Sequence, residues 1–139
     1  MKPFHVFLAL AIAVPLAVAF QAPTGPPAGE PGRHLMWIGR ITPGGAVTEF
    51  SEGLTPGCRP LSIVVRDGDL WFSEYAAGRI GRITVAGEVS EYPVPTPDSE
   101  PRAMASHPDG NIWFVQTRAN GLGRIDRRGR VTEFPVKTP

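Results

Sequence analysis

Histidine is the side chain that most often carries acid–base and metal chemistry in proteins, and this chain of 139 residues has three histidines. They are His5, His34 and His107. None has a carboxylate or a second histidine at the spacing of a metal-binding motif, so the sequence alone does not assemble a metal site. His107 comes directly before a Pro-Asp-Gly turn, and we interpret it as an exposed turn residue rather than a general base.

Two glutamates and one cysteine are the other candidates for a site. Glu74 and Glu100 fall where predicted strands meet loops, a place where a carboxylate can bind a ligand or simply be solvated. Cys58 has no second cysteine to pair with, so we expect a half-buried spectator thiol; a free reactive thiol or an intermolecular disulfide stay open. The sequence carries no glycine-rich phosphate loop, paired-cysteine motif or nucleophile elbow.

The elements that must position these residues are internal repeats. The stretch 80–92 recurs 42 residues upstream as 38–50 and 42 residues downstream as 122–134. A second signature, Asp-Gly-Asp-Leu-Trp-Phe from Asp67, recurs as Asp-Gly-Asn-Ile-Trp-Phe from Asp109. Self-similarity at a period near 40 that contains strand patterns is typical of β-propeller blades. We therefore predict an all-β fold, a partial β-propeller built of four-stranded antiparallel blades with a 42-residue repeat.

Each copy of the first motif is predicted to form a hairpin with a two-residue turn, such as Gly44-Gly45. That turn sets the motif's arginine opposite its glutamate, and its glycine opposite its aromatic residue. An opposite-charge pair across strands contributes roughly 0.2–1 kcal/mol, and an aromatic ring covers the backbone that a glycine exposes. We therefore assign a structural role to three pairs: Arg40 with Glu49, Arg82 with Glu91, and Arg124 with Glu133.

The chain divides into three predicted parts. Residues 1–19 combine Lys2, an apolar run and the small residues Ala17-Val18-Ala19, which is typical of a secretory signal peptide cut after Ala19. The apolar run is shorter than the roughly 20 residues of a membrane-spanning helix, although an uncleaved anchor is the alternative. Residues 20–34 are predicted to be a Pro/Gly-rich linker. Residues 35–139 form the partial propeller, with a half-blade at 35–51, a blade at 60–94 and a blade at 101–136.

The predicted signal peptide implies a secreted or periplasmic protein with no membrane segment after cleavage. The whole chain has 14 Lys and Arg against 13 Asp and Glu, so removal of Lys2 leaves equal numbers of basic and acidic residues. This neutral balance gives no electrostatic reason to expect a nucleic-acid partner. The one basic cluster, residues 127–130, lies on a predicted turn, where solvated arginines are common.

The predicted blades number about two and a half, fewer than the roughly four to eight that close a propeller. A lone set of blades leaves apolar faces and open strand edges exposed. Two explanations are open. The chain is a truncated product or partial reading frame, or several copies associate to complete one ring. Self-association is therefore a partner interaction that the blade count allows.

The two signatures and their 42-residue period resemble those of the virginiamycin B lyase (streptogramin lyase) family, over about residues 36–139. The resemblance implies a seven-bladed propeller. In the true lyases of that family, a magnesium-assisted elimination opens the ester linkage of a cyclic depsipeptide antibiotic. A histidine acts there as the base, and histidine and glutamate side chains hold the metal. The family's catalytic stretch reads Glu-Pro-His-Gly, followed by Trp-Phe and a further glutamate.

This chain departs from that stretch at the base. Glu100 matches the first glutamate, but Arg102 occupies the place of the histidine. Gln116 and Thr117 stand where the later carboxylate is expected. An arginine stays protonated, so it can neither abstract a proton nor bind a cation. The preceding repeat also lacks the histidine, although Glu74 follows its Trp-Phe pair as a carboxylate.

Two functions stay open at the level of the sequence. One is a non-catalytic binding or scaffolding module, whose small-molecule or peptide ligand the sequence does not name. The other is a magnesium-dependent lyase of type B streptogramins, active when missing blades or other subunits supply the histidines. Its candidate catalytic carboxylates are Glu100 and Glu74, with Glu100 as the candidate Mg²⁺ ligand. A gluconolactonase-like or NHL-type binder shares the architecture, and no cofactor other than that Mg²⁺ is evident.

Overall fold

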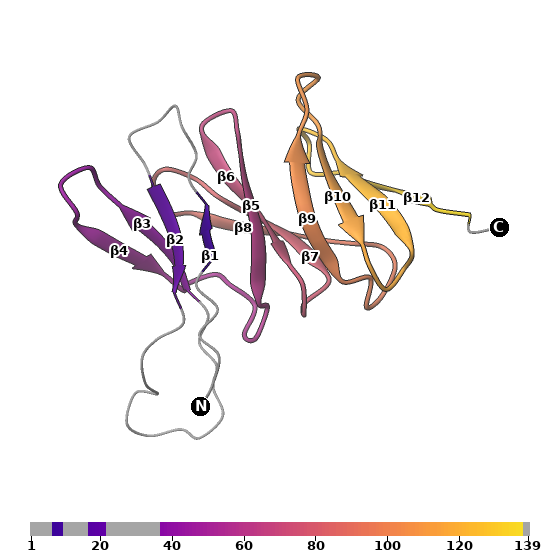
Figure 1. Cartoon of the computed structure of the whole chain (residues 1–139), viewed down its shortest axis with the longest axis horizontal. Helices are drawn as coiled ribbons and strands as arrows, with labels where there is room; N and C mark the ends of the chain where they lie inside the picture. The colour runs from indigo at the N-terminus through magenta and orange to yellow at the C-terminus, as the bar shows by residue number, and fades with distance from the viewer. Residues whose placement is uncertain (1–6, 10–16, 22–36, 138–139) are drawn as a thin grey trace.

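The computed structural model describes residues 7–9, 17–21 and 37–137, which form strands, turns and loops without a helix (Figure 1). Accordingly, the described residues offer no helix that is long and apolar enough to cross a membrane. The strands, in chain order, are β1 Phe7–Ala9, β2 Ala17–Gln21, β3 Trp37–Ile41, β4 Val47–Phe50, β5 Pro60–Arg66, β6 Asp69–Glu74, β7 Arg79–Ile83, β8 Val89–Pro93, β9 Pro101–Ser106, β10 Ile112–Gln116, β11 Gly121–Ile125 and β12 Val131–Pro135.

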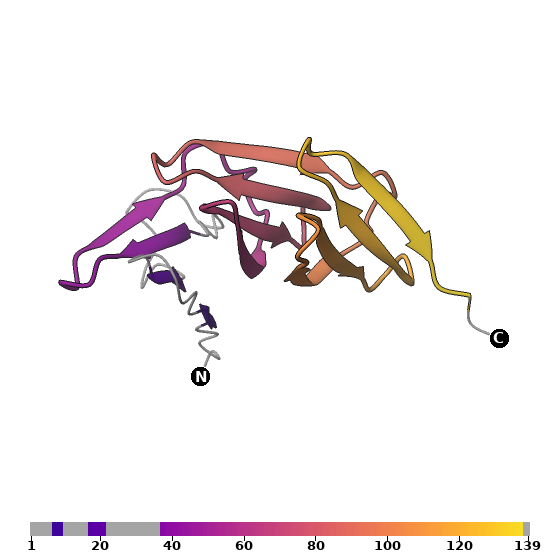
Figure 2. The ribbon, with the colours of Figure 1, turned by 90° about the horizontal axis from the view of Figure 1, so that it is seen from above.

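These strands form three four-stranded antiparallel sheets, which we call blade 1 (β1–β4), blade 2 (β5–β8) and blade 3 (β9–β12). Within each blade the strands lie side by side in chain order. The blades are arranged like a fan: β5 and β9 lie against each other, and Figure 2 shows β4, β8 and β12 along the outer side. The predicted all-β fold of four-stranded antiparallel blades is confirmed, and the ranges predicted for two whole blades coincide with blades 2 and 3.

Blade 1 has more strands than the half-blade predicted at 35–51. β2 pairs with β3 from Ala17 with Ile41 to Gln21 with Trp37, and β1 pairs with β2. The half-blade prediction was wrong because it followed only the repeated motif. The stretch 17–21 contains the strand-forming residues Val18 and Phe20 and gives β3 the ladder partner that an open edge lacks. β2 therefore spans the boundary between the predicted signal peptide and the predicted linker. Apart from β1 and β2, both predicted segments lie outside the described residues.

The hairpin of the repeated motif has a three-residue turn, not the predicted two-residue turn. In blade 2 the Thr84 N–H donates to the Glu88 carbonyl at 3.0 Å, and the Gly87 N–H donates to the Thr84 carbonyl at 2.9 Å. Gly87 has a φ of +94°, in the left-handed region that favours glycine. Blades 1 and 3 repeat these hydrogen bonds and a glycine of positive φ. The extra turn residue shifts the strand register by one position.

This register overturns the three predicted charge pairs. The motif's arginine faces a threonine or serine, and its glutamate faces the glycine. Because neighbouring residues of a strand point to opposite faces, the arginine and the glutamate lie on different sides of the blade. The pairs that this register excludes are Arg40 with Glu49, Arg82 with Glu91, and Arg124 with Glu133.

The motif's glycine is covered by an aromatic ring, but by a different ring from the one predicted. A Cβ atom built on Gly81 would lie 2.1 Å from the ring of Phe72, and one built on Gly123 would lie 2.1 Å from the ring of Phe114. Each phenylalanine sits directly opposite its glycine on the preceding strand of the same blade. The Trp-Phe signature and the glycine of the stretches 80–92 and 122–134 therefore recur together because the phenylalanine packs on the glycine.

The core lies between the blades. One cluster packs Ile38 of blade 1 against Phe72 of blade 2, and a second packs Ile80 of blade 2 against Phe114 of blade 3. Full burial of one such side chain contributes about 1.5–3 kcal/mol. Since blade 2 is covered on both faces, the consecutive apolar residues of β6 are all buried.

Arg66 ties blades 2 and 3 together inside this core. Its guanidinium lies 3.7 Å from the centroid of the Trp71 ring. Its Nη1 donates to the carbonyl oxygens of Gly110, Ile125 and Asp126 in blade 3, at 3.3, 3.3 and 3.2 Å. Burial lowers the pKa of Arg66, yet an arginine keeps its charge in proteins. The three carbonyl dipoles and the ring face stabilise that buried charge.

Candidate functional site

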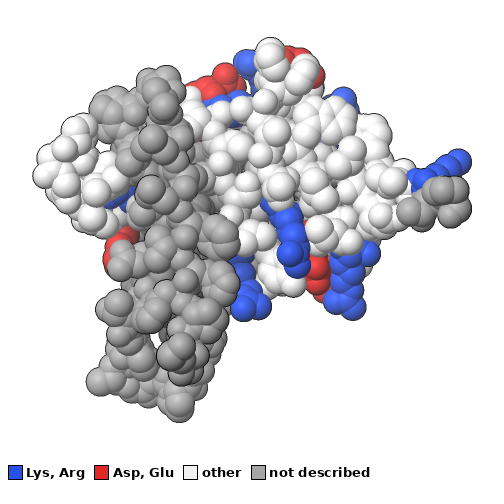
Figure 3. Space-filling model, in the orientation of Figure 1, with Lys and Arg blue, Asp and Glu red and all other residues white. Residues whose placement is uncertain are grey.

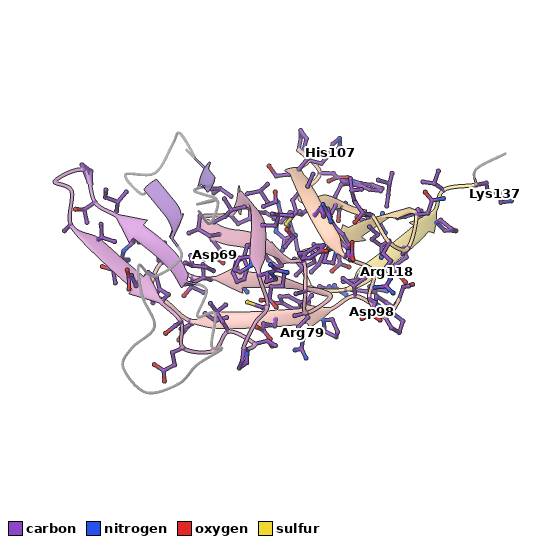
Figure 4. The ribbon with its side chains drawn as sticks, turned by 60° about the horizontal axis from the view of Figure 1, so that its bottom comes forward. Asp69, Arg79, Asp98, His107, Arg118 and Lys137 are labelled. Carbon is purple, nitrogen blue, oxygen red and sulfur yellow. The ribbon has the colours of Figure 1, made fainter. Side chains whose placement is uncertain are left out.

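The loops that lead into β9 and out of β10 form the candidate site. Figure 4 labels Asp98 and Arg118 at this end of the blades. Glu100 closes the linker before β9 with a φ of +53°, and its backbone carbonyl accepts a hydrogen bond from the Thr117 N–H at 3.2 Å. The Thr117 hydroxyl also donates to the Glu100 carboxylate at 3.2 Å. Glu100 is thus held in place with its carboxylate partly exposed.

Arg102 fills the place where the family resemblance implies a histidine. Its Nη2 lies 3.5 Å from Glu100 Oε2, and its guanidinium lies 4.6 Å from the centroid of the Tyr75 ring in blade 2. An exposed ion pair of this kind contributes about 0–1 kcal/mol to stability. The cation and the ring instead form a polar and aromatic surface that bridges two blades, which can donate hydrogen bonds but cannot accept a proton.

Glu74, the second predicted candidate, is buried at the end of β6 rather than exposed in a loop. Neither of its carboxylate oxygens has a hydrogen-bond donor among the described residues. Burial, and after it the neighbouring Glu91 carboxylate, raise the pKa of Glu74 from 4.5 to about 8. At neutral pH Glu74 is therefore mostly protonated, and its hydroxyl can donate to Glu91.

The repeat places Gln116 of blade 3 at the position of Glu74. The Gln116 amide Nε2 donates to Glu133, the counterpart of Glu91, and Gln116 is also buried. An amide in blade 3 and a carboxyl group in blade 2 therefore occupy equivalent buried positions beside the motif's glutamate.

The motif's glutamates bind the linkers between blades, a role that sequence analysis missed. Glu91 accepts hydrogen bonds from the Thr55 N–H and hydroxyl, both at 2.6 Å, and lies 3.1 Å from Arg79. Glu133 accepts from the Thr96 N–H and hydroxyl at 3.2 and 3.0 Å. The available signal was the Thr-Pro pair ahead of blade 2 and of blade 3, 36 or 37 residues before the glutamate that the threonine contacts.

The motif's arginines contact partners other than the predicted glutamates. Arg82 Nε donates to Asp69 Oδ2 at 2.8 Å within blade 2. Arg40 of blade 1 donates from Nη1 to the Val85 carbonyl of blade 2 at 3.0 Å. Arg124 lies over two aromatic rings of blade 3. These contacts leave the arginines no part in the candidate site.

Two further reactive side chains, His107 and Cys58, lie among the described residues. Figure 4 labels His107 at the opposite end of the blades, where it is exposed, with Nδ1 3.0 Å from Asp109 Oδ1. His5 and His34 lie outside the described residues.

Cys58 is fully buried rather than half-buried, and burial raises the pKa of its thiol to about 12. A thiol that stays protonated is a poor nucleophile, which agrees with the spectator role expected of it.

The described residues do not fit the magnesium ion that the resemblance implies. Among them, no three His, Cys, Asp or Glu side chains lie close enough to hold a metal ion. The Glu100 carboxylate has a guanidinium beside it, and the Glu74 carboxyl group is mostly neutral. Magnesium needs several oxygen ligands in octahedral geometry, and a neighbouring cation opposes its binding.

Comparisons with known proteins agree with the sequence signatures. The model of the virginiamycin B lyase family matches residues 32–139. None of the curated proteins matches the chain. Among solved structures, a selenomethionine-substituted virginiamycin B lyase from Staphylococcus aureus is 34% identical with a TM-score of 0.69, covering 76% of this chain and 39% of that one. A streptogramin B lyase structure is 36% identical with a TM-score of 0.68, covering 76% of this chain and 38% of that one.

A third structure covers the whole chain. It is a catalytically inactive virginiamycin B lyase from Staphylococcus aureus with quinupristin, 30% identical with a TM-score of 0.78, covering 100% of this chain and 44% of that one. The chain thus spans about two fifths of the length of the lyases that it matches. The partial propeller and the resemblance are confirmed, and the chain belongs to the virginiamycin B lyase family.

Proposed function

We propose that this chain is an exported, non-catalytic binding module of the virginiamycin B lyase type, whose ligand is a peptide such as a cyclic depsipeptide. The observation that carries the proposal is Arg102. It stands where the family resemblance implies the catalytic histidine, paired with Glu100 and packed on Tyr75. Export is supported by the signal-like composition of residues 1–19.

The chemistry of this end of the blades favours binding over elimination. A guanidinium keeps its proton at any physiological pH, so it cannot remove one from a substrate. It can donate hydrogen bonds to ligand carbonyl groups, while the Tyr75 ring offers an apolar contact and the Thr117 hydroxyl a further polar one. A related lyase structure contains quinupristin, which makes this antibiotic the first ligand to test.

Calorimetric titration of the full chain with quinupristin, with and without Mg²⁺, measures binding, and chromatography of the same mixtures measures ring opening. An elimination that opens a ring keeps every atom, so the product is recognised by its retention time and not by its mass. We expect binding that does not depend on Mg²⁺, and unchanged antibiotic. Arg102→Ala should weaken binding about tenfold, which corresponds to about 1.4 kcal/mol.

Arg128→Ala is the matched control. Arg128 is an exposed arginine on the turn between β11 and β12, at the opposite end of the blade, and its removal should leave the affinity unchanged. Ring opening that requires Mg²⁺ and is lost in Glu100→Gln would contradict the proposal and establish the alternative, a lyase completed by other blades or subunits. The absence of any binding heat would contradict a binding role for this class of ligand.

A further inference from the structure

The first strand of blade 3 is irregular next to the candidate site. Phe114 of β10 lies opposite Met104 of β9, whereas Gln116 lies opposite Pro101. β9 therefore has one residue more than β10 in this interval, which is a β-bulge, and Arg102 belongs to the bulge. A bulge changes the direction in which its side chains point, so whatever holds this bulge also determines where the Arg102 guanidinium lies.

Blade 2 has an equivalent bulge, and a serine of the same blade holds it. β5 shifts its register against β6 between Pro60 and Ile63. The Ser62 N–H, inside this bulge, donates to the Ser73 hydroxyl oxygen at 3.1 Å. The repeat places Val115 at the position of Ser73 in blade 3, and a valine side chain offers no acceptor. The bulge in β9 therefore cannot be held in the same way.

The bulge in β9 is bonded to blade 2 instead. β5 and β9 lie against each other, and the Met104 N–H donates to the Ser62 hydroxyl oxygen across the junction at 3.1 Å. Among the described strands β9 pairs with β10 alone, so the N–H groups on its other side have no strand to bond to. Ser62 therefore serves both bulges, with its N–H in its own blade and with its hydroxyl oxygen in blade 3.

The same bulge contacts blade 2 a second time through Arg102. Its guanidinium lies 4.6 Å from the centroid of the Tyr75 ring and 3.5 Å from Glu100 Oε2. Figure 3 shows Lys, Arg, Asp and Glu side chains mainly toward the two ends of the blades in that view, so charged neighbours are frequent at a loop end. An exposed ion pair does little to fix one geometry. The position of the guanidinium therefore depends on the backbone that carries it, and that backbone is bonded to Ser62.

We propose that Ser62 is the positioning residue of the candidate site: its hydroxyl oxygen fixes the bulge in β9 and thereby holds the Arg102 guanidinium over Tyr75. Without this acceptor the Met104 N–H loses its partner, and the bulge can slide along β9 by one residue. Such a slip turns a side chain to the other face of its sheet, which would carry Arg102 away from Tyr75. The effect on affinity rests on the proposed binding function, whereas the effect on the position of Arg102 does not.

Nuclear magnetic resonance of the isotope-labelled full chain measures the position of Arg102 without any ligand. We expect cross-relaxation between the Arg102 side chain and the Tyr75 ring protons in the wild type. Ser62→Ala, which keeps the N–H bond to Ser73, should lose most of that intensity, while Ser62→Thr should retain it. Ser106→Ala removes an exposed serine at the far end of β9 and is the matched control, with the intensity unchanged. Absence of the signal from the wild type, or an unchanged signal in Ser62→Ala, would overturn the proposal.

A second substitution tests the bulge itself, also where Ser62→Ala folds less well. Val115→Ser gives the bulge in β9 an acceptor within its own blade, as Ser73 does in blade 2. Added to Ser62→Ala, it should restore the contact between Arg102 and Tyr75. A loss of contact in Ser62→Ala that Val115→Ser does not restore would show that Ser62 does not act through the bulge, and the proposal would be wrong.

Calorimetric titration with quinupristin connects this position to the proposed function. Ser62→Ala should weaken binding about fivefold, and adding it to Arg102→Ala should change the affinity no further, because residues that act through one another are not additive. A wild-type chain that does not bind quinupristin contradicts the proposed function, while the contact between Arg102 and Tyr75 still decides the positioning role. Binding that falls with Arg102→Ala but not with Ser62→Ala contradicts the positioning role alone.

Discussion

At the scale of single residues, Glu74 and Gln116 place two different chemical groups at equivalent positions of consecutive blades. Each is buried at the end of its strand and faces the glutamate that binds a linker. An amide can donate to that glutamate at any pH, whereas a carboxyl group can donate only while it keeps its proton. Ionised Glu74 would be a buried negative charge beside Glu91, with no donor among the described residues.

We predict that the free energy of unfolding falls as the pH rises from about 5 to about 8, and that Glu74→Gln removes this fall. The pKa of Glu74 is raised from 4.5 to about 8, so the folded chain keeps a proton that the unfolded chain loses above pH 4.5. The stabilisation is therefore complete below pH 4.5 and is lost as the pH rises through about 8. One pKa unit corresponds to about 1.4 kcal/mol, so the wild type should lose a few kcal/mol.

Urea unfolding of wild type and variants at pH 5 and pH 8.5 measures this difference. Gln116→Glu is the informative counterpart, because it creates a second buried carboxyl pair with Glu133 and should make the fall steeper. The same slope in wild type and Glu74→Gln would show that Glu74 does not hold its proton in the folded state.

At the scale of the element, the three-residue turn decides which side chains share a blade face. Gly45 has a φ of +86°, and a Cβ atom built on it would meet nothing within 4 Å. An alanine there would therefore cost only the conformational energy of a positive φ, without a steric clash. Gly45→Ala should therefore destabilise the chain by about 1–2 kcal/mol. Gly44 has no positive φ, and Gly44→Ala should change stability by less than about 0.5 kcal/mol. Urea unfolding of both variants distinguishes this turn from a two-residue turn of type I′, in which both glycines need a positive φ and both changes would be costly.

At the scale of the whole molecule, stability depends on the junctions between blades. Arg66 provides polar contacts in the junction between blades 2 and 3. Arg66→Met keeps most of the side-chain stem and removes its three hydrogen bonds to blade 3. We predict a loss of about 1.5–3 kcal/mol in the free energy of unfolding, since the bonds come from a charged donor. Arg128→Met, on an exposed turn, should change it by less than about 0.5 kcal/mol. Equal effects of the two changes would show that the Arg66 contacts do not stabilise the junction.

The predicted cleavage after Ala19 has a consequence for blade 1. It would remove β1 and cut β2 between its third and fourth residues, leaving the inner edge of β3 largely without a partner. We predict that a chain of residues 20–139 unfolds at lower urea concentration than the full chain, with blade 2 and blade 3 unchanged. The intact mass of the exported protein shows whether the cut occurs. Equal urea midpoints would show that β1 and β2 add no stability.

Much of the architecture could be predicted from the sequence because repetition identifies equivalent residues without any structure. The 42-residue period determined the strands of blades 2 and 3 and the β3–β4 hairpin, and the signatures determined the family. The resemblance to that family implied a histidine at the position of Arg102. These inferences compare sequence positions, and they require no knowledge of which strands touch.

What only the tertiary structure decided is how those positions meet. Because the turn has one residue more than predicted, Arg82 and Glu91 point to opposite faces of the blade. The glycine-containing turn sequence is compatible with either turn length. Glu91 binds Thr55 of a linker 36 residues away, and Glu74 is fully buried at the end of a strand. Neither feature leaves a pattern in the neighbouring sequence. The chain's own motifs therefore specify the blade, while register and burial depend on packing between segments far apart in sequence.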